Sequence, residues 1–354
     1  MTEPLALNRR RFLVAGSAAL AVAACSGDDD DDPSTAEATP ETTTSTTSTT
    51  TTIDPALRAT APLTGVVGPF KPKVGRAALV VKVDNHEDAR PQLGIDRADV
   101  IVEEQVESGI SRLVSVFHSR TPPEIGPIRS TRSTDFDIIP LFGRPVYASS
   151  GGNEGVMNGL AAVDKIDVGH NRGGTGFRRI SRPGPHNLVA DPEALYGRAG
   201  DAADTPPAPI FDFLAEAERL HESRREIAEA SVRMGARTLV RWRWNQTTRS
   251  WDRLHGSTLH KTNDGARRSP THVVILQVPY ERGGGVGRSI PHGVTTGSGP
   301  AHVLVSRRVV AGTWSRPTPA GRFDLRTEDG TVMKLKPGQT VIQLPQTGAN
   351  ITFS

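Results

Sequence analysis

The side chains best suited to chemistry are concentrated in one stretch of the sequence, where acidic, amide and arginine residues alternate with short apolar runs. They are Asp84, Asn85, Arg90, Gln92, Glu103, Glu107, Arg112, Arg129 and Arg132. Carboxylates can transfer protons, and arginine forks bind carboxylate, sulfate or phosphate groups. This combination makes the stretch the first candidate for a binding or catalytic site.

A β-hairpin is expected to position the central part of this set. Residues 99–106 and 110–117 are rich in β-branched side chains, and Ser108-Gly109 between them can form a two-residue turn. In the register that this turn sets, Gln105 pairs with Arg112. Arg112 would therefore share one face of the hairpin with the acidic residues of the first strand.

Two roles are open for the acidic residues of that face, Glu103 and Glu107. Four residues along a strand span roughly 13 Å between Cα atoms. Hydrolysis of sugars by paired carboxylates needs carboxyl groups about 5 to 9.5 Å apart. Because Arg112 lies between them, a charge network is expected, which either stabilises the sheet or contributes to a binding or catalytic site.

Two further arginines follow the hairpin. A Gly126-Pro127 turn precedes hydroxyl and acidic residues, a pattern that predicts the start of a helix. Arg129 and Arg132 would then share one face of its first turn, where guanidinium groups and free backbone N–H groups can bind an anion. Alternatively, these arginines neutralise Glu103, Glu107 or Asp137.

Loops at the ends of predicted strands supply the remaining candidates. The apolar run 76–83 predicts a buried strand that ends at Asp84 and Asn85, which are either site residues or turn formers. His186, beside Asn187 in a loop rich in Pro and Gly, is the best candidate for a general base. The alternative is a solvated loop histidine.

The sequence gives no indication of a metal site or a cofactor. Its ten histidines show no H-x-x-x-H or Cys/His spacing, and no G-x-S-x-G motif is present. The GGTG at 173–176 lacks the strand–turn–helix context of a phosphate-binding loop. We therefore expect neither a metal nor a nucleotide cofactor, and the sequence leaves open whether the protein is an enzyme.

The elements that must position these residues belong to an α+β fold, predicted from many turns and short apolar runs. The 354 residues include 35 Gly and 27 Pro, which favour a loop-rich fold. We expect a signal peptide at 1–24, a lipidated and disordered tether at 25–61, a mixed α/β domain at 62–205 and a smaller β-rich domain at 206–354. Residues 145–149 are expected to form a strand, Asp191 to cap a short helix, and 210–234 to form one helix.

The N-terminus carries the pattern of an export signal. Arg9 and Arg10 are followed, after one residue, by Phe12 and Leu13, as in twin-arginine signals. The apolar run that follows is too short for a membrane span, and it ends in Val-Ala-Ala before Cys25, as in a bacterial lipobox. We expect lipidation of Cys25 and a location at the extracytoplasmic face of the cell membrane, rather than ordinary cleavage beside a stray cysteine.

Charge is unevenly distributed between the tether and the body. Residues 25–61 carry eight acidic residues and one arginine, and are rich in threonine, which predicts disorder. Residues 62–354 carry 38 basic and 30 acidic residues. A basic body suits anionic partners, but aromatics make up only 5 % of the chain and no basic run interleaves with them. Nucleic acid is therefore not expected as a partner.

Several motifs resemble those of the YerB-like lipoproteins, a bacterial family of unknown biochemical function. They are ARPQ at 89–92, ADVIVEEQVESGISR at 98–112, IGPIRSTR at 125–132, PHN at 185–187, GTW at 312–314 and KPGQ at 336–339. Family members usually have a glycine at the position of Ser108. The resemblance implies a two-domain lipoprotein of the cell envelope and supplies no reaction.

Three functions remain open. The first is a tethered binding protein that holds an anionic envelope ligand through Arg112, Arg129 and Arg132, with Glu103, Glu107 and His186 ordering the pocket. The second is a hydrolase or transferase acting on an envelope polymer or phosphoester, with His186 or Glu103 as the base. The third is an envelope scaffold in which the charged residues are purely structural.

Overall fold

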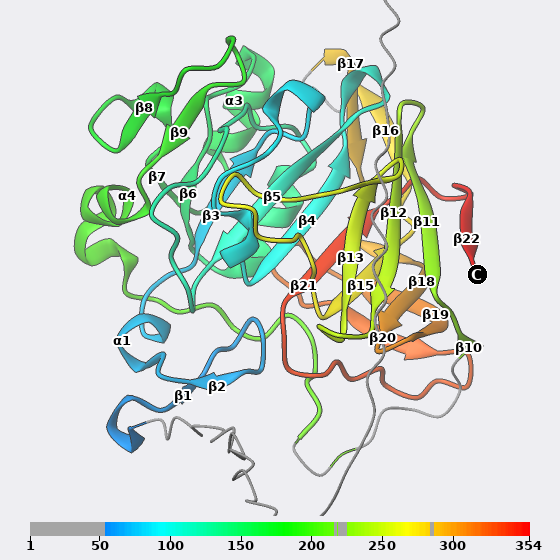
Figure 1. Cartoon of the computed structure of the whole chain (residues 1–354). Coiled ribbons are helices and arrows are strands. Elements are labelled where there is room, and N and C mark those ends of the chain that lie inside the picture. Colours follow the sequence, from blue (N-terminus) through cyan, green and yellow to red (C-terminus); the bar gives the residue numbers. More distant parts are fainter. Residues whose placement is uncertain (1–53, 216–217, 219–224, 284–286) are drawn as a thin grey trace, which may run out of the picture. The chain divides into compact units, whose positions relative to one another are not determined.

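The computed structural model describes residues 54–215, 218, 225–283 and 287–354 (Figure 1). These residues lie in one compact unit, Thr52–Ser354. The predicted signal peptide, Cys25 and most of the predicted tether lie outside the described residues.

Strands dominate the described chain. They are β1 (Ala59–Thr60), β2 (Val67–Gly68), β3 (Leu79–Val83), β4 (Val100–Gln105), β5 (Ser111–Phe117), β6 (Val146–Ala148), β7 (Ile166–Asp167), β8 (Phe177–Arg179), β9 (Leu188–Ala190), β10 (Arg225–Glu226), β11 (Glu229–Gly235), β12 (Thr238–Asn245), β13 (Ser250–His255), β14 (Thr258–Leu259), β15 (His272–Leu276), β16 (Tyr280–Gly283), β17 (Gly287–Gly293), β18 (Gly297–Val305), β19 (Arg308–Arg316), β20 (Asp324–Thr327), β21 (Thr340–Leu344) and β22 (Ile351–Phe353). The fold is therefore sheet-rich.

The α-helices of the described residues are short. They are α1 (Lys71–Val74), α2 (Asp135–Ile138), α3 (Glu154–Ala161) and α4 (Pro192–Ala199). Asp191 caps α4 as predicted, because its side chain accepts hydrogen bonds from the backbone N–H groups of Glu193 and Ala194. Among the described residues no helix is both long and apolar enough to cross a bilayer.

One large mixed sheet unites strands from both halves of the sequence. Its order is β10-β19-β18-β15-β21-β4-β5-β3-β6-β7, with β20 pairing β19. The two halves meet where β21 pairs in parallel with β4, in a register that places Gln343 beside Glu103. Figure 1 shows this junction as a red strand beside a cyan one. The centre of the sheet thus depends on residues about 240 positions apart in the sequence.

Each face of the large sheet has its own apolar core. On one face, Ile101 and Leu113 pack with Val240, Trp242 and Trp251 from a second sheet, whose order is β14-β13-β12-β11-β22. On the other face, the apolar side chains of β4 and β5 pack with those of α2, Phe211 and Trp314. Alternation of side chains along β4 therefore sends neighbouring residues into different environments.

The predicted hairpin register is wrong by one residue. Between β4 and β5, three residues, Glu107–Gly109, form a 3-10 turn, which is closed by a 2.9 Å bond from Val106 N to Ile110 O. Glu104 therefore pairs with Arg112, not Gln105. Because side chains alternate along a strand, this shift places Glu103 and Arg112 on opposite faces of the sheet.

The turn itself explains this difference. Ser108 and Gly109 both adopt positive φ, at 61° and 67°. The carbonyl of Gly109 accepts hydrogen bonds from Arg237 N at 2.9 Å and from Thr238 Oγ1 at 3.2 Å. The loop before β12 thus stabilises the longer turn, a tertiary interaction that the local sequence does not indicate.

Two other predictions fail. Residues 210–234 do not form one helix, since β11 begins at Glu229 and buries Ala230, Val232 and Met234 with the alternation of a strand. The folded body also begins before residue 62, because β1 pairs with β2 and Ala61 is fully buried.

Candidate functional site

Asp84 organises the first group of candidate residues from the end of β3. Its Oδ1 accepts a hydrogen bond from His86 N at 3.1 Å. Its Oδ2 lies 2.7 Å from Nδ1 of His186 and 3.0 Å from Nε of Arg129. Asp84 is only 1 % exposed, so its carboxylate is fixed by these neighbours rather than by water.

Arg129 reaches Asp84 from an extended segment and not from a helix. Arg129 N donates to Lys82 O at 2.9 Å, and Arg129 O accepts from Ser150 N at 3.0 Å. The predicted helix begins only at Asp135, whose backbone N–H bonds Arg132 O. The prediction that both arginines occupy a first helical turn is therefore wrong, because the backbone at 128–129 pairs with β3.

Arg112 and Arg132 also belong to this group of candidate residues, together with Glu107. Arg132 Nε donates to the Glu107 carboxylate at 2.8 Å, and Arg112 Nη1 donates to Ser130 O at 2.9 Å. Burial, reinforced by the charges of Arg132 and Arg129, lowers the pKa of Arg112 to about 10. Burial alone would raise the pKa of Glu107, but the hydrogen bond and charge of Arg132 outweigh it and lower that pKa.

We call these residues the Asp84 cluster. Its members are Asp84, Glu107, Arg112, Arg129, Arg132 and His186. The side chains of Arg129 and Arg132 are 24 % and 16 % exposed. The cluster combines three guanidinium groups with two carboxylates and remains in contact with solvent, so it can bind an anion.

Glu103 lies elsewhere, in a sealed pair with Arg253 of β13. Arg253 Nη1 and Nη2 donate to its two oxygens at 2.6 and 2.7 Å, and Ser111 and Gln343 donate to it at 2.6 and 2.8 Å. Burial opposes ionisation, but the charge and hydrogen bonds of Arg253 outweigh it and lower the pKa of Glu103 to about 2. Glu103 is fully buried, so the prediction that it shares a pocket with Arg112 and Arg129 is wrong.

Asn85, Gln92 and Arg90 belong with this sealed pair. Asn85 Nδ2 donates to Ser111 Oγ at 2.9 Å, and Gln92 Nε2 donates to Asn85 Oδ1 at 3.2 Å. Arg90 Nη2 donates to Asn85 O at 2.7 Å, and burial together with the charge of Arg253 lowers the pKa of Arg90 to about 10. A cavity of about 100 Å³ lies beside Asn85 and Arg90.

Asn187 supports the loop of His186 rather than the cluster itself. Its side chain accepts a hydrogen bond from Arg179 Nη1 at 2.7 Å and donates one to Arg182 O at 3.0 Å. His186 is 9 % exposed, so it is neither a fully solvated loop histidine nor a sealed one.

A buried ion-pair network beneath the cluster was missed by the sequence analysis. Lys82 of β3 bonds Glu104 of β4 and, at 2.6 Å, Asp135 of α2, and all three side chains are fully buried. Burial and the nearby charge of Asp135 raise the pKa of Glu104 to about 7. In the sequence, Lys82 lies within an apolar run, and nothing near it indicates that Glu104 and Asp135 are its partners.

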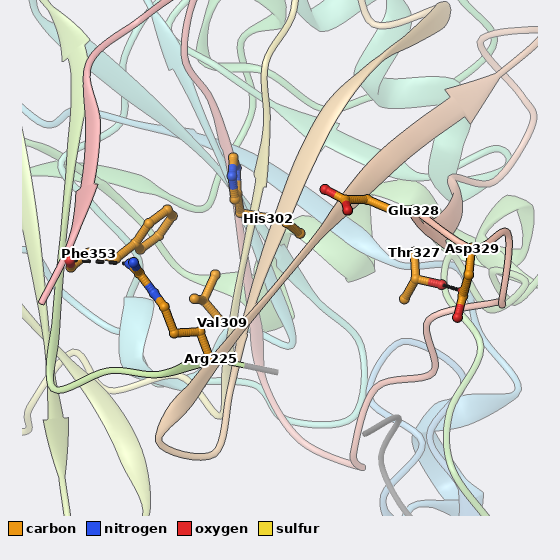
Figure 2. Close-up of a pocket in the computed structure, with 8 residues that line it drawn as sticks. Arg225, His302, Val309, Thr327, Glu328, Asp329 and Phe353 are labelled. Carbon is orange, nitrogen blue, oxygen red and sulfur yellow. Dashed lines mark hydrogen bonds between the residues drawn. The ribbon is translucent and has the colours of Figure 1, made fainter. Parts of the chain in front are cut away.

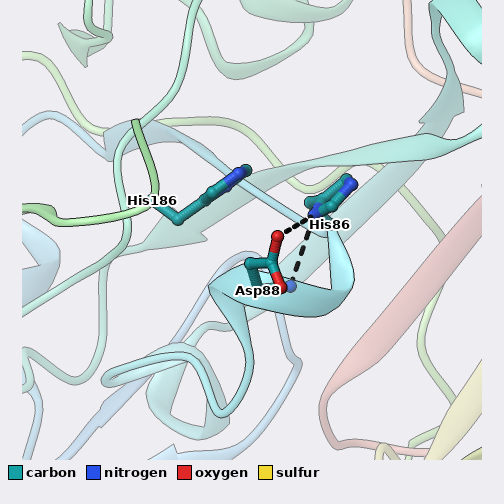
Figure 3. A group of neighbouring side chains, drawn as sticks. All are labelled: His86, Asp88 and His186. Carbon is teal, nitrogen blue, oxygen red and sulfur yellow. Dashed lines mark hydrogen bonds and ion pairs between the residues drawn. The ribbon is translucent and has the colours of Figure 1, made fainter. Parts of the chain in front are cut away.

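The folded chain also assembles a set of metal-type donors that the spacing of histidines did not indicate. His86, Asp88 and His186 each offer one donor atom within 4.8 Å of the other two (Figure 3). The two histidines are 100 positions apart, so no short motif could have revealed them.

The larger cavities of the described residues lie away from the Asp84 cluster. One of about 490 Å³ is lined by residues of β10, β18, β19, β20 and β22, including Arg225, His302 and Phe353 (Figure 2). Another of about 820 Å³ lies between the segment at 58–67 and residues 209–218. Neither is lined by a predicted site residue.

Comparison with known proteins identifies close matches for both halves of the chain. Residues 63–205 match the family described as "Protein of unknown function (DUF3048) N-terminal domain", and residues 230–342 match the corresponding C-terminal domain. The chain is 42 % identical over 92 residues to "Putative lipoprotein YerB" of Bacillus subtilis (strain 168). That match covers 24 % of this chain and 28 % of the relative, less than a third of its length.

The fold has a counterpart among solved structures. The crystal structure of the YerB protein from Bacillus subtilis superposes with a TM-score of 0.72 at 22 % identity, covering 83 % of this chain and 99 % of that one. At this identity the likeness concerns the fold alone. Together with the two family matches, it confirms the resemblance predicted from the sequence motifs: the chain is similar to YerB and belongs to the DUF3048 family.

Proposed function

We propose that this chain is an exported, lipid-anchored protein of the cell envelope that binds an anionic envelope ligand at the Asp84 cluster. The name of its Bacillus subtilis relative as a lipoprotein supports the anchor. The twin-arginine pattern at Arg9 and Arg10 and the lipobox cysteine at Cys25 support the same assignment. The anchor would hold the folded body at the extracytoplasmic face of the membrane.

The observation that carries anion binding is the environment of Arg112. This guanidinium is 4 % exposed, its Nε has no hydrogen-bond partner, and among the described residues it forms no ion pair, although the carboxylates of Asp84, Glu107 and Glu104 act on its charge from further away. A buried charge whose counter-ions lie beyond contact distance is incompletely compensated, so an anion bound in direct contact would stabilise it. Arg129 and Arg132 lie close enough for their charges to lower the pKa of Arg112, and their side chains are open to solvent.

The neighbouring carboxylates favour selective binding over a general attraction to negative charge. Asp84 and Glu107 hold Arg129 and Arg132 through their Nε atoms. These contacts fix the orientation of both guanidinium groups. Phosphate, sulfate or carboxylate groups match the planar fork of arginine, so polymers or lipids that carry them are the expected ligands.

The test is retention of the full-length chain on isolated cell envelope. Arg129→Ala/Arg132→Ala should reduce retention by at least tenfold, because each charge-assisted contact contributes about 1.5–3 kcal/mol and every 1.4 kcal/mol is about tenfold. Retention of the wild type should also fall as salt is raised. The readout is the fraction of protein that sediments with washed envelope fragments.

A matched control is available at the other end of the fold. Arg322 and Arg326 are exposed arginines paired with Asp212 and Asp324, and neither belongs to the cluster. Arg322→Ala/Arg326→Ala removes the same net charge and should leave retention within about twofold of the wild type. Equal losses in the two double variants would show that only net charge matters and would refute the site.

A second candidate function rests on the pair formed by Asp84 and His186. A carboxylate that accepts from Nδ1 leaves Nε2 of the histidine available as a general base, and Arg129 beside it can stabilise developing negative charge. This arrangement favours hydrolysis or transfer at an envelope phosphoester, without a role for the sealed Glu103. His186→Gln should abolish such turnover, and it should reduce retention on envelope less than Arg129→Ala/Arg132→Ala does, because it keeps all three guanidinium groups.

A further inference from the structure

His86 and Asp88 have no part in the proposed anion site, yet they face His186 across a short gap. His86 precedes a 3-10 turn, Glu87–Ala89, that follows the end of β3, and His186 lies in the loop between β8 and β9. The two imidazole rings stack with centroids 4.7 Å apart and an interplanar angle of 17°. Figure 3 shows the Asp88 carboxylate directed at His86, with the His186 ring beside them.

The donor atoms are close to the geometry that a metal ion requires. Nδ1 of His86 lies 3.4 Å from Oδ2 of Asp88 and accepts a hydrogen bond from Asp88 N at 3.3 Å, which a bound ion would replace. Two donors about 2.0–2.1 Å from a tetrahedral zinc ion are roughly 3.3 Å apart. One donor from each of the three residues lies within 4.8 Å of the others, so closure needs shifts of about 1.5 Å together with rotation of one stacked imidazole, because a bound ion lies in the plane of each ring. The Asp88 side chain is 63 % exposed and free to supply such a shift.

Asp84 provides the outer support that metal-binding histidines usually have. Its Oδ2 lies 2.7 Å from Nδ1 of His186, which fixes the ring and leaves Nε2 for a ligand. Its Oδ1 accepts the backbone N–H of His86 at 3.1 Å, which positions the second histidine as well. A buried carboxylate that holds the far nitrogen of a ligating histidine orients the ring and raises its basicity.

We propose that His86, Asp88 and His186 form a binding site for a divalent transition metal ion, with Zn²⁺ as the representative ion. Two imidazoles and one carboxylate are donors that zinc accepts, and three protein ligands leave a coordination position for water or for a ligand. The partial exposure of His86 and Asp88 gives the ion a path from solvent. The metal ligands are not the arginines that would contact the anion, so this site goes beyond the proposed anion binding.

The test is zinc binding by the full-length chain, measured by equilibrium dialysis and isothermal titration calorimetry with Zn²⁺ alone. The wild type should bind one ion per chain. His86→Asn/His186→Asn should weaken binding at least 100-fold, and Asp88→Asn about tenfold. Asp84→Asn keeps every donor atom and should weaken binding about 10- to 100-fold, because it removes the outer carboxylate.

Controls separate this site from other places where zinc could bind. His170 is an exposed histidine outside the cluster, and His170→Asn should leave the affinity unchanged. Arg129→Ala/Arg132→Ala should keep the zinc stoichiometry even where it loses retention on envelope, so the two proposals fail or stand separately. Circular dichroism establishes that each variant is folded, and Asp88→Asn changes an exposed side chain that the fold does not need.

Two outcomes would overturn the inference. One is the absence of saturable zinc binding by the folded wild type. The other is equal affinity in the wild type and in folded His86→Asn/His186→Asn or Asp88→Asn, which would place the bound zinc at other residues.

Discussion

The same chemical pair, a carboxylate with a guanidinium, occurs twice near the centre of this fold in opposite environments. Glu103 and Arg253 have side chains that are 0 % and 3 % exposed and meet through two bonds of 2.6 and 2.7 Å. Asp84 and Arg129 meet through a single 3.0 Å contact, and the Arg129 side chain is 24 % exposed. The first pair is saturated by protein donors, whereas the second leaves part of its arginine available.

This difference teaches how to separate structural from functional charge in such a protein. In the sealed pair, Ser111 and Gln343 bond the carboxylate oxygens that Arg253 already holds, so no position remains for a ligand. In the Asp84 cluster, the positive groups outnumber the carboxylates, and the side chains of Arg129 and Arg132 are 24 % and 16 % exposed. Satisfied polar groups stabilise a fold, and incompletely satisfied ones at a surface indicate binding.

The largest effect is expected from Arg253→Ala. Removing one partner of a buried ion pair leaves Glu103 charged and uncompensated, which should lower the free energy of unfolding by about 3–5 kcal/mol. Arg267, whose side chain is 50 % exposed and paired with Asp252, is a matched control, and Arg267→Ala should cost less than about 1 kcal/mol. Denaturant unfolding measures both, and similar losses would show that the sealed pair does not stabilise the fold.

An effect of intermediate size is expected from acid. The folded pKa of Glu103, about 2, lies below its ordinary value of 4.5, so its contribution is present above about pH 4.5 and is lost as pH falls toward 2. The loss is on the order of 3 kcal/mol, at about 1.4 kcal/mol per pKa unit. Glu103→Gln cannot titrate, so the difference in unfolding free energy between the two proteins should shrink across this window. Parallel curves would contradict the assignment.

The smallest effect on stability is expected from Arg129→Ala. Its pair with Asp84, in which the Arg129 side chain is 24 % exposed, should contribute less than about 1 kcal/mol, because the backbone N–H of His86 and the ring of His186 continue to bond the carboxylate. Thermal unfolding should therefore change little although envelope binding falls. A loss as large as that of Arg253→Ala would assign the Asp84 cluster to the structure of the fold instead.

Much of the secondary structure could be predicted because it depends on local pattern. The apolar run ending at Val83 and the segment at 146–148 form strands, much of the region 206–354 predicted to be β-rich does so as well, and Asp191 caps its helix. Three of the four tryptophans of the chain, Trp242, Trp251 and Trp314, are fully buried. Burial and capping require only neighbouring residues, which the sequence displays.

The partners of the polar residues could not be predicted, because they come from distant segments. Arg253 reaches Glu103 across 150 positions, and Gln343 across 240. The face on which Glu103 lies was decided by one extra residue in a turn, which the loop before β12 stabilises. The sequence therefore displays the unusual side chains, but their division into a sealed pair and an open cluster depends on the fold.

The position of β21 has a consequence for biosynthesis. Thr340–Leu344 lies between β15 and β4, in the middle of the large sheet, yet it is synthesised after every other strand of that sheet. Until it emerges from the ribosome, β4 and β15 each present an unpaired edge that can join another chain. The nascent protein should accordingly depend on chaperones late in translation, and truncations before residue 340 should aggregate rather than accumulate as a stable N-terminal fragment.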